Sequence, residues 1–140
     1  MSVLVTDAGF APEDWTFGFH APGQSPTPDS TALALDIVPD FDVTALPRDF
    51  AAIDLIRLHV PQTGDGRAFS QARLLRLLGF TGRLRAQGEV LPDQYPLARR
   101  CGFDEVEISR ARAARQPEGQ WRAQLACQTG SYQDRLRHFA

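Results

Sequence analysis

The stretch DLIRLHVPQTGDGRAFSQARLLRLLGFTGRLRAQG, residues 54–88, decides the fold that the sequence predicts. Residues 54–60 and 82–88 alternate apolar and polar side chains, as half-buried strands do. Between them, a polar glycine-rich loop at 62–67 leads into a helix expected around 69–78. Strand, helix and strand in this order are typical of a parallel α/β sheet.

The same strand–helix unit recurs on both sides of this stretch. Residues 32–38 predict a strand with a short helix at 44–52, and residues 105–109 predict a strand with a helix within 117–127. A further helix is expected at 93–101. Gly79 and Gly102, each followed by Phe, stand where a left-handed residue ends a helix. We therefore expect four sequential strand–helix units.

The predicted strands are apolar on one face only. The opposite face carries polar side chains, namely Asp36, Arg57, His59, Arg83, Arg85, Gln87, Glu105 and Glu107. A doubly wound sheet is apolar on both faces, because helices cover both. The pattern thus favours an α/β fold with a parallel sheet and helices mainly on one face, like half of a TIM barrel. A flavodoxin-like three-layer sandwich is the alternative. The polar face then needs a partner, the N-terminal segment or water to cover it.

The 140 residues are sufficient for a single domain, 1–140. Residues 1–31 are expected as an N-terminal arm, residues 32–127 as the strand–helix core, and residues 128–140 as a C-terminal tail. Charge is distributed unevenly along this chain. The first 47 residues hold seven acidic residues and no Arg, whereas all fifteen arginines follow. This predicts either a basic face for an anion or acidic partner, or an acidic N-terminal third that folds over the basic part.

Several classes of protein are disfavoured by composition and motifs. No apolar run is long enough to cross a membrane, and no signal peptide is seen. The two isolated cysteines form neither a disulfide framework nor a CxxC pair, so a reducing, cytoplasmic location is expected. No cofactor is predicted, because the glycine fingerprints of dinucleotide and nucleotide sites are missing. Scattered histidines predict no metal site, and no nucleic-acid-binding motif occurs.

Candidate functional residues cluster at the carboxyl ends of the predicted strands, where parallel sheets bind ligands. The loop 64–67 also precedes a helix, whose free N–H groups attract anions; Ser70 is a candidate cap. Candidates for anion or partner binding are Arg57, Asp65, Gly66, Arg67, Ser70, Arg85, Gln87, Gly88, Asp93 and Gln94. Candidates for proton transfer are His59, Asp65 and Asp93, although no nucleophile–base set accompanies them. Without a ligand, Asp65 would cap a turn, and the arginines would form a cross-strand ionic ladder with carboxylates.

Three ordered motifs carry a family resemblance: DGRAFSQARLLR at 65–76, GFTGRLRAQGEVLPDQ at 79–94 and RCGFD at 100–104. Together with Glu13-Asp14-Trp15, they resemble the bacterial DUF934 family. That family is often labelled as oxidoreductases of sulfite reduction, because its members are encoded near assimilatory sulfite reductase and phosphoadenylylsulfate reductase genes. The resemblance implies a place in sulfate assimilation, but no particular reaction.

The expected function is therefore an accessory protein that docks to or assists one of these two reductases. A small stand-alone enzyme that binds an oxyanion of sulfur is the alternative, so catalysis by this chain stays open. A homodimer with an internal site is a third arrangement.

Overall fold

The computed structural model describes residues 2–23, 32–46 and 50–129. Its centre is a six-stranded sheet in the order β2-β1-β6-β5-β4-β3. The strands are β1 (Ser2–Thr6), β2 (Gly9–Pro12), β3 (Ala34–Ile37), β4 (Leu55–Val60), β5 (Arg83–Gly88) and β6 (Glu105–Ser109). The helices are η1 (Val43–Ala45), η2 (Phe50–Ala52), α1 (Arg67–Leu77), η3 (Pro92–Gln94), α2 (Tyr95–Cys101), α3 (Arg110–Arg115) and α4 (Glu118–Thr129).

The four predicted strands are present as β3 to β6, and they pair in parallel in chain order. The prediction of a purely parallel sheet is nevertheless wrong. Strand β1 pairs antiparallel with both β2 and β6, so the sheet is mixed. Residues 2–12, expected within an N-terminal arm, therefore form a hairpin that extends the sheet beyond β6.

Two helix predictions need correction. The helix expected at 44–52 is replaced by two short 3-10 turns, η1 and η2, on either side of residues 47–49, which lie outside the described part. Helix α3 was missed, because its sequence has no apolar face and it starts directly after β6. The side chain of Ser109 caps it by accepting a hydrogen bond from the Arg112 backbone N–H. The helix expected within 117–127 is confirmed as α4.

Both predicted glycine helix ends are confirmed. Gly79 and Gly102 have φ angles of +106° and +111°, in the left-handed region that favours glycine. The backbone N–H of Phe80 then donates to Leu75, five residues back, and the N–H of Phe103 donates to Ala98. Both phenylalanine side chains are buried under the helices that they follow.

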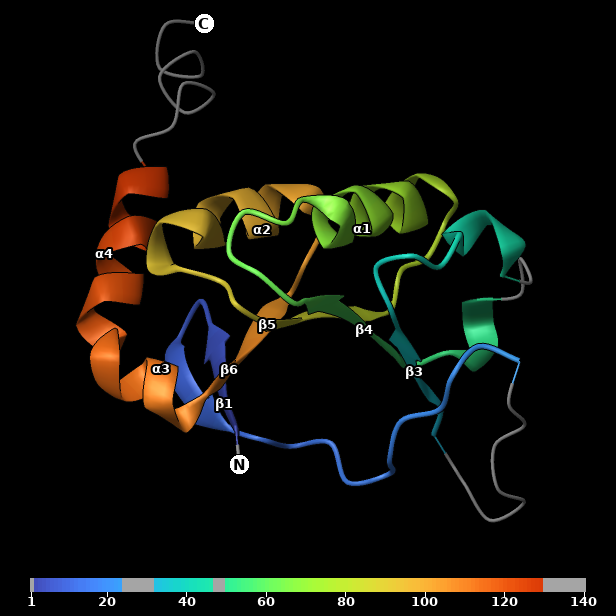
Figure 1. The fold of residues 1–140 in the computed structure, drawn as a ribbon, viewed down its shortest axis with the longest axis horizontal. Coiled ribbons are helices and arrows are strands. Elements are labelled where there is room, and N and C mark those ends of the chain that lie inside the picture. The colour runs from blue at the N-terminus through green and yellow to red at the C-terminus, as the bar shows by residue number, and fades with distance from the viewer. Residues whose placement is uncertain (1, 24–31, 47–49, 130–140) are drawn as a thin grey trace, which may run out of the picture.

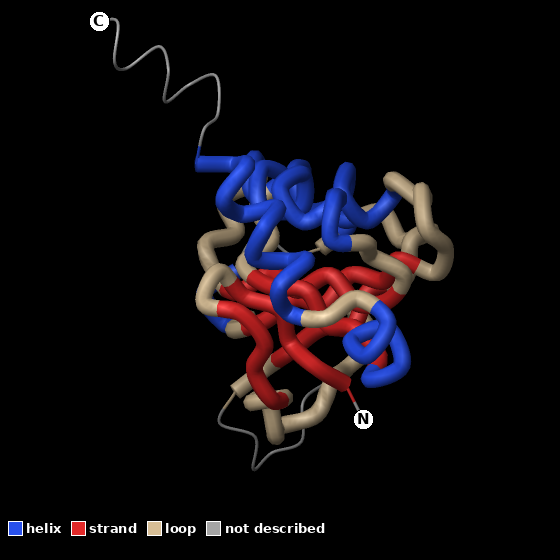
Figure 2. Tube along the Cα trace, turned by 90° about the vertical axis from the view of Figure 1, so that its left-hand side faces the viewer, coloured by secondary structure: helices blue, strands red, loops and turns tan. Residues whose placement is uncertain are grey.

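The apolar core lies between one face of the sheet and the helices. Figure 1 places α1 and α2 on that face, and Figure 2 shows the strands as a layer below most of the helices. Alternate residues of β4 to β6 point into this core with side chains of α1, α2 and α4, including Ile56, Leu58, Leu84, Val106, Leu75, Ala98 and Trp121. The one-sided apolar pattern of the sequence is thus confirmed.

Candidate functional site

The second face of the sheet carries the polar side chains that the sequence predicted there. The register sets Asp36 beside Arg57, Arg57 beside Arg85, and Arg85 beside Glu105. Two residues further along the strands, on the same face, Gln87 lies between His59 and Glu107. Polar residues of four neighbouring strands are therefore side by side and close enough to pair.

Arg85 is the centre of this polar face. The Arg85 side chain is fully buried. Its Nη1 donates to Glu107 at 2.8 Å and to Glu13 at 2.6 Å. Asp14 and Glu105 lie within 3.4 and 3.5 Å of Nη2. Four carboxylates thus surround one guanidinium, although its buried Nε makes no hydrogen bond with the described residues. Arg85 is a structural ion-pair centre and is not open to a ligand.

Residues 13–20, which we call the N-terminal strap, cross this polar face (Figure 1). Glu13 and Asp14 supply two of the carboxylates around Arg85, and Asp14 also pairs with Arg83 at 2.6 Å. The Phe19 ring packs 3.7 Å from the Arg57 guanidinium carbon, as a cation–π contact does. His20 then pairs with β3 through backbone hydrogen bonds. The N-terminal segment, one of the three covers that the sequence analysis named, thus lies over this face.

The strap carboxylates are held in their charged forms. Burial raises the pKa of Glu13, but the Trp15 backbone N–H and the Arg85 guanidinium outweigh burial, so its pKa lies below 4.5. Burial likewise raises the pKa of Asp14. The charges of Arg83 and Arg85, with the hydrogen bond from Arg83, outweigh burial, so the pKa of Asp14 lies below 3.8. The strap is therefore attached to the sheet largely by ion pairs.

His59 lies near the carboxyl end of β4 between two oxygen acceptors. Its Nε2 is 2.5 Å from Asp36 Oδ1, and its Nδ1 is 2.8 Å from Gln87 Oε1. Donating to both oxygens requires a hydrogen on each ring nitrogen, which is the imidazolium form. The hydrogen bond with Asp36 raises the pKa of His59 above 6.5. Burial raises the pKa of Asp36, but hydrogen bonds from His59 and Arg57 outweigh it and bring the value to about 2.

The glycine-rich loop before α1 is closed by its own charges. Asp65 accepts from the Arg67 backbone N–H, and the Arg67 guanidinium pairs with Asp65 at 2.7 Å and Asp40 at 2.6 Å. The hydrogen bonds from Arg67 lower the pKa of Asp65 to about 2. Gly66 is the N-cap residue, and Ser70 lies inside α1, so Ser70 is not the cap. The capped turn is thus in place at this loop, and Asp65 and Asp40 pair with the half-exposed Arg67 guanidinium.

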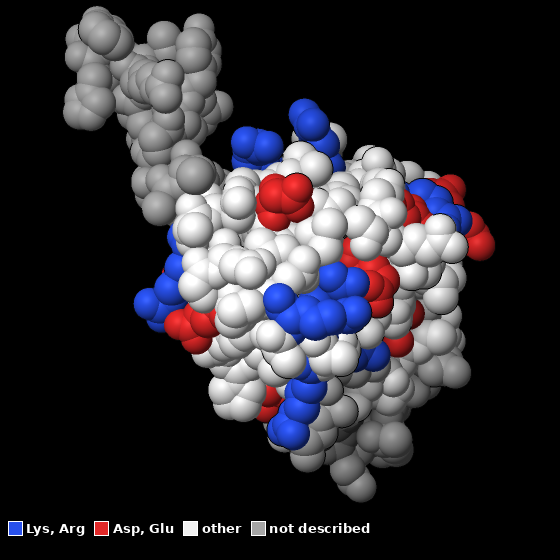
Figure 3. Space-filling model, turned by 60° about the vertical axis from the view of Figure 1, so that its left-hand side comes forward, with Lys and Arg blue, Asp and Glu red and all other residues white. Residues whose placement is uncertain are grey.

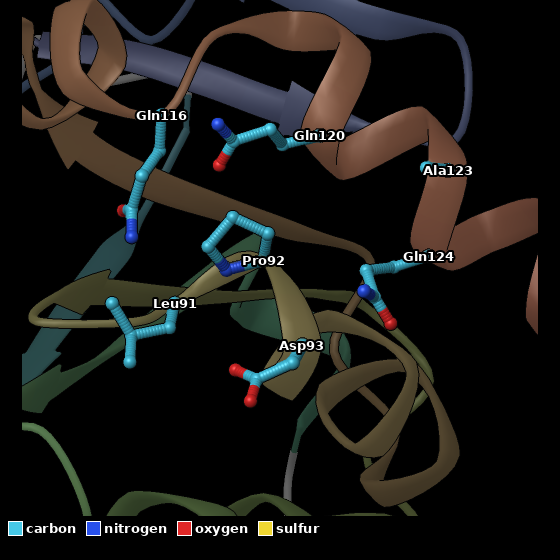
Figure 4. Close-up of a pocket in the computed structure, with 7 residues that line it drawn as sticks. All are labelled: Leu91, Pro92, Asp93, Gln116, Gln120, Ala123 and Gln124. Atoms are coloured by element: carbon cyan, nitrogen blue, oxygen red, sulfur yellow. The ribbon is translucent and has the colours of Figure 1, made fainter.

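The end of β5 and the loop after it hold the remaining candidates, Gly88, Asp93 and Gln94, which differ in what they contact. Gly88 has a φ of +128°, and a Cβ there would lie 2.3 Å from the Val60 carbonyl oxygen, so glycine is needed for the close approach of two strands. The Gln94 side chain accepts from the Leu91 N–H and thereby closes the η3 turn. Asp93 makes no ion pair or hydrogen bond with the described residues and lines a cavity of about 390 Å³ beside α4 (Figure 4).

Three glutamines on the opposite wall of this cavity were missed by sequence reasoning. Gln116, Gln120 and Gln124 are four residues apart, and they face Leu91, Pro92 and Asp93 across the cavity (Figure 4). The spacing of four places Gln120 and Gln124 on one side of α4, and Gln116, the C-cap residue of α3, lies at the same wall. This interval was the available signal, but nothing in the sequence indicated which loop would lie opposite.

Metal-ligating clusters and cysteine thiols are two further kinds of group that can carry chemistry. The described residues contain no group of three or more His, Cys, Asp or Glu placed to hold a metal ion. Burial raises the pKa of the Cys101 thiol, which disfavours the reactive thiolate. The Cys127 side chain lies outside the described part. Among the described helices, none has the length and apolar character needed to span a bilayer.

The fold and this face define a small α/β protein with a mixed sheet, covered by helices on one side and by a charged strap on the other. A model of bacterial proteins of unknown function, DUF934, matches residues 34–139. The chain therefore belongs to the DUF934 family, as its motifs indicated. No curated protein and no solved structure matched the chain.

Proposed function

We propose that this chain is an accessory protein of assimilatory sulfate and sulfite reduction that docks to or assists sulfite reductase or phosphoadenylylsulfate reductase. The pathway follows from the gene neighbourhood that the family resemblance implies. The polar face supports this mode of action only by disfavouring the alternative, because its arginines are already paired with carboxylates of the same chain. Docking, rather than independent turnover, is the function that its charges favour.

The observation that carries the docking mode is the pairing of the candidate arginines. Arg57, Arg67 and Arg85 each form ion pairs with two or more carboxylates of the same chain. A sulfur oxyanion would have to displace these carboxylates and would meet their negative charge. A stand-alone enzyme that holds an oxyanion with these arginines is therefore disfavoured. A protein that only binds a partner does not need an unpaired arginine at this face.

The test is affinity capture of the tagged full-length chain from its bacterial host grown on sulfate as the sole sulfur source. A parallel culture grown on cysteine is the control, because it needs no sulfate reduction. Recovery of either reductase from the sulfate culture, with sirohaem and iron–sulfur absorbance in the case of sulfite reductase, supports the proposal. Recovery of the chain without a reductase from both cultures rejects it.

A second candidate is a small oxyanion-binding enzyme with His59 as a proton donor. One observation favours it: His59 is oriented by Asp36 and Gln87 near the carboxyl ends of parallel strands, where active sites of such sheets lie. Calorimetric titration of the purified chain with sulfite and sulfate tests this candidate. Saturable binding that is lost in His59→Gln supports an enzyme, and the same heat in both proteins, or none, rejects it.

A further inference from the structure

The cavity between η3 and α4 has no occupant within the described chain. One wall is Leu91, Pro92 and Asp93, and the other carries Gln116, Gln120 and Gln124 (Figure 4). Its volume of about 390 Å³ is within the range of ligand pockets. One wall of the cavity is the loop after the carboxyl end of β5. Ligands of parallel sheets commonly bind at this edge.

The polar groups that line this cavity are largely unused. The side chains of Asp93, Gln120 and Gln124 make no hydrogen bond or ion pair with described residues, although the Gln120 backbone N–H donates to Pro117. The Gln116 side-chain oxygen accepts from Arg112 at 3.0 Å, which leaves its amide N–H₂ group available. The cavity thus offers one carboxylate and amide groups of both donor and acceptor character.

The charge of the lining selects the kind of occupant. Asp93 is the only charged side chain of the lining, and the nearby Arg112 is already paired with Glu89. An anion would be repelled, and a wholly apolar group would leave the amides without hydrogen-bond partners. A cationic head group on an aliphatic stem satisfies both walls, because its stem packs on Leu91 and Pro92 while its head meets Asp93 and amide oxygens.

We propose that this cavity is a docking pocket for an Arg or Lys side chain of a partner protein. The inference rests on the proposed function, since it names the chemistry through which an accessory protein would hold its partner. Figure 3 shows the side of the molecule with α3 and α4, where a group of basic side chains lies among broad uncharged areas. Helix α3 carries Arg110, Arg112 and Arg115, and Arg112 is paired with Glu89. Within the cavity lining itself, Asp93 is the charge that a basic side chain would meet.

The test is a titration of the ¹⁵N-labelled full-length chain with N-acetyl-L-arginine methylamide, monitored by the side-chain amide resonances of the three glutamines. The citrulline analogue is the matched probe, because it has nearly the same shape and no charge. We expect saturable shifts with the arginine probe, and binding weaker by about 1.4- to fivefold with citrulline, the range that one exposed charge pair commonly contributes.

Asp93→Asn should weaken binding of the arginine probe to the level of citrulline, whereas Asp40→Asn, at an exposed acid of another loop, should not. Equal binding by wild type and Asp93→Asn, or no saturable shift, would overturn the inference. The chain also carries Arg135 and Arg137, so the double variant Arg135→Gln/Arg137→Gln is titrated in parallel. Tighter probe binding there would identify the chain itself as the occupant and overturn docking of a partner.

No reductase is present in this titration, so its failure does not affect the capture experiment. Capture of a reductase together with a negative titration would reject the pocket and retain the proposed function. A positive titration without capture would retain the pocket and reject the assignment to these reductases.

Discussion

Arg85 shows at the scale of one residue why the polar face is structural. Its guanidinium is buried among four carboxylates, so its removal leaves several negative charges close together with little water. Arg67, which makes similar pairs, is about half exposed, and solvent screens its partners. Two arginines with similar ion pairs therefore differ in their effect on stability.

We expect Arg85→Met to lower the free energy of unfolding by about 3–5 kcal/mol, the usual cost of breaking a buried ion pair on one side. Arg67→Met is the matched control and should unfold near the wild-type urea midpoint. Urea denaturation followed by circular dichroism measures both. Equal midpoints for Arg85→Met and wild type would contradict the central role of Arg85.

His59 should make stability depend on pH. Its pKa is raised above 6.5 in the folded protein, so folding favours the protonated ring. This contribution is complete below pH 6.5 and is lost as the pH rises through the folded pKa. Urea midpoints between pH 5.5 and 9 should therefore fall for the wild type and fall less for His59→Gln. An identical decline in both proteins would show that other groups cause it.

The strap is the element whose attachment depends on charge. Glu13 and Asp14 have lowered pKa values, so their stabilising effect is present above their unfolded values of 4.5 and 3.8 and declines as the pH falls below them. Trp15 lies in the strap and is partly exposed, whereas Trp121 is buried in the core. Quenching of tryptophan fluorescence by acrylamide therefore reports mainly on the strap.

We expect Glu13→Gln/Asp14→Asn to increase acrylamide quenching at neutral pH, because the strap loses its ion pairs to Arg83 and Arg85. Wild-type protein should show the same increase as the pH is lowered toward 3. Asp40→Asn, which changes an acid outside the strap, should quench like wild type. A double variant with wild-type quenching would mean that Phe19 and the backbone suffice to hold the strap.

The junction of β4 and β5 depends on a single glycine. Gly88→Ala would place a Cβ 2.3 Å from the Val60 carbonyl oxygen at a φ of +128°, so we expect a loss of about 2–4 kcal/mol. Gly119→Ala, in α4 and with no atom within 4 Å of its Cβ, should be neutral or stabilising by up to about 1 kcal/mol. Thermal unfolding compares the two. Equal melting temperatures would show that the β4–β5 junction adjusts.

At the scale of the whole molecule, the N-terminal third is part of the folding unit. Strand β1 lies between β2 and β6 in the sheet, and Leu4 and Val5 are buried. The turn after β1 is tied to α2, since Asp7 accepts from Tyr95 at 2.8 Å and pairs with Arg99. The division into an arm and a core that the sequence indicated thus separates pieces that share one sheet.

We expect a chain that starts at residue 32 to lose cooperative unfolding, because it exposes the edge of β6 and removes two carboxylates from Arg85. Circular dichroism and size-exclusion chromatography of this truncated chain are the measurements. A monomer with a sharp thermal transition would show that residues 32–140 fold alone.

Local sequence predicted much of the secondary structure and the parallel pairing of β3 to β6, but not the antiparallel pairing of β1 and β2. Alternation located β3 to β6 to within two residues, and the glycine ends of two helices were found from Gly-Phe pairs. The candidate site was predicted only in part. The polar face and the ionic ladder of Arg57, Arg83 and Arg85 were foreseen, whereas the glutamines across from Asp93 were missed.

The sequence by itself therefore determined the strand–helix order, the one-sided apolar sheet and the family, because these depend on local periodicity and short motifs. Only the tertiary structure decided that residues 2–12 join the sheet antiparallel, and that Glu13 and Asp14 reach Arg83 and Arg85 some seventy positions away. Long-range ion pairs leave no periodic trace in a chain, since they require only that two charges meet after folding. The same reason explains why Asp93 faces three glutamines across a cavity, since the spacing of the glutamines alone did not indicate what would lie opposite them.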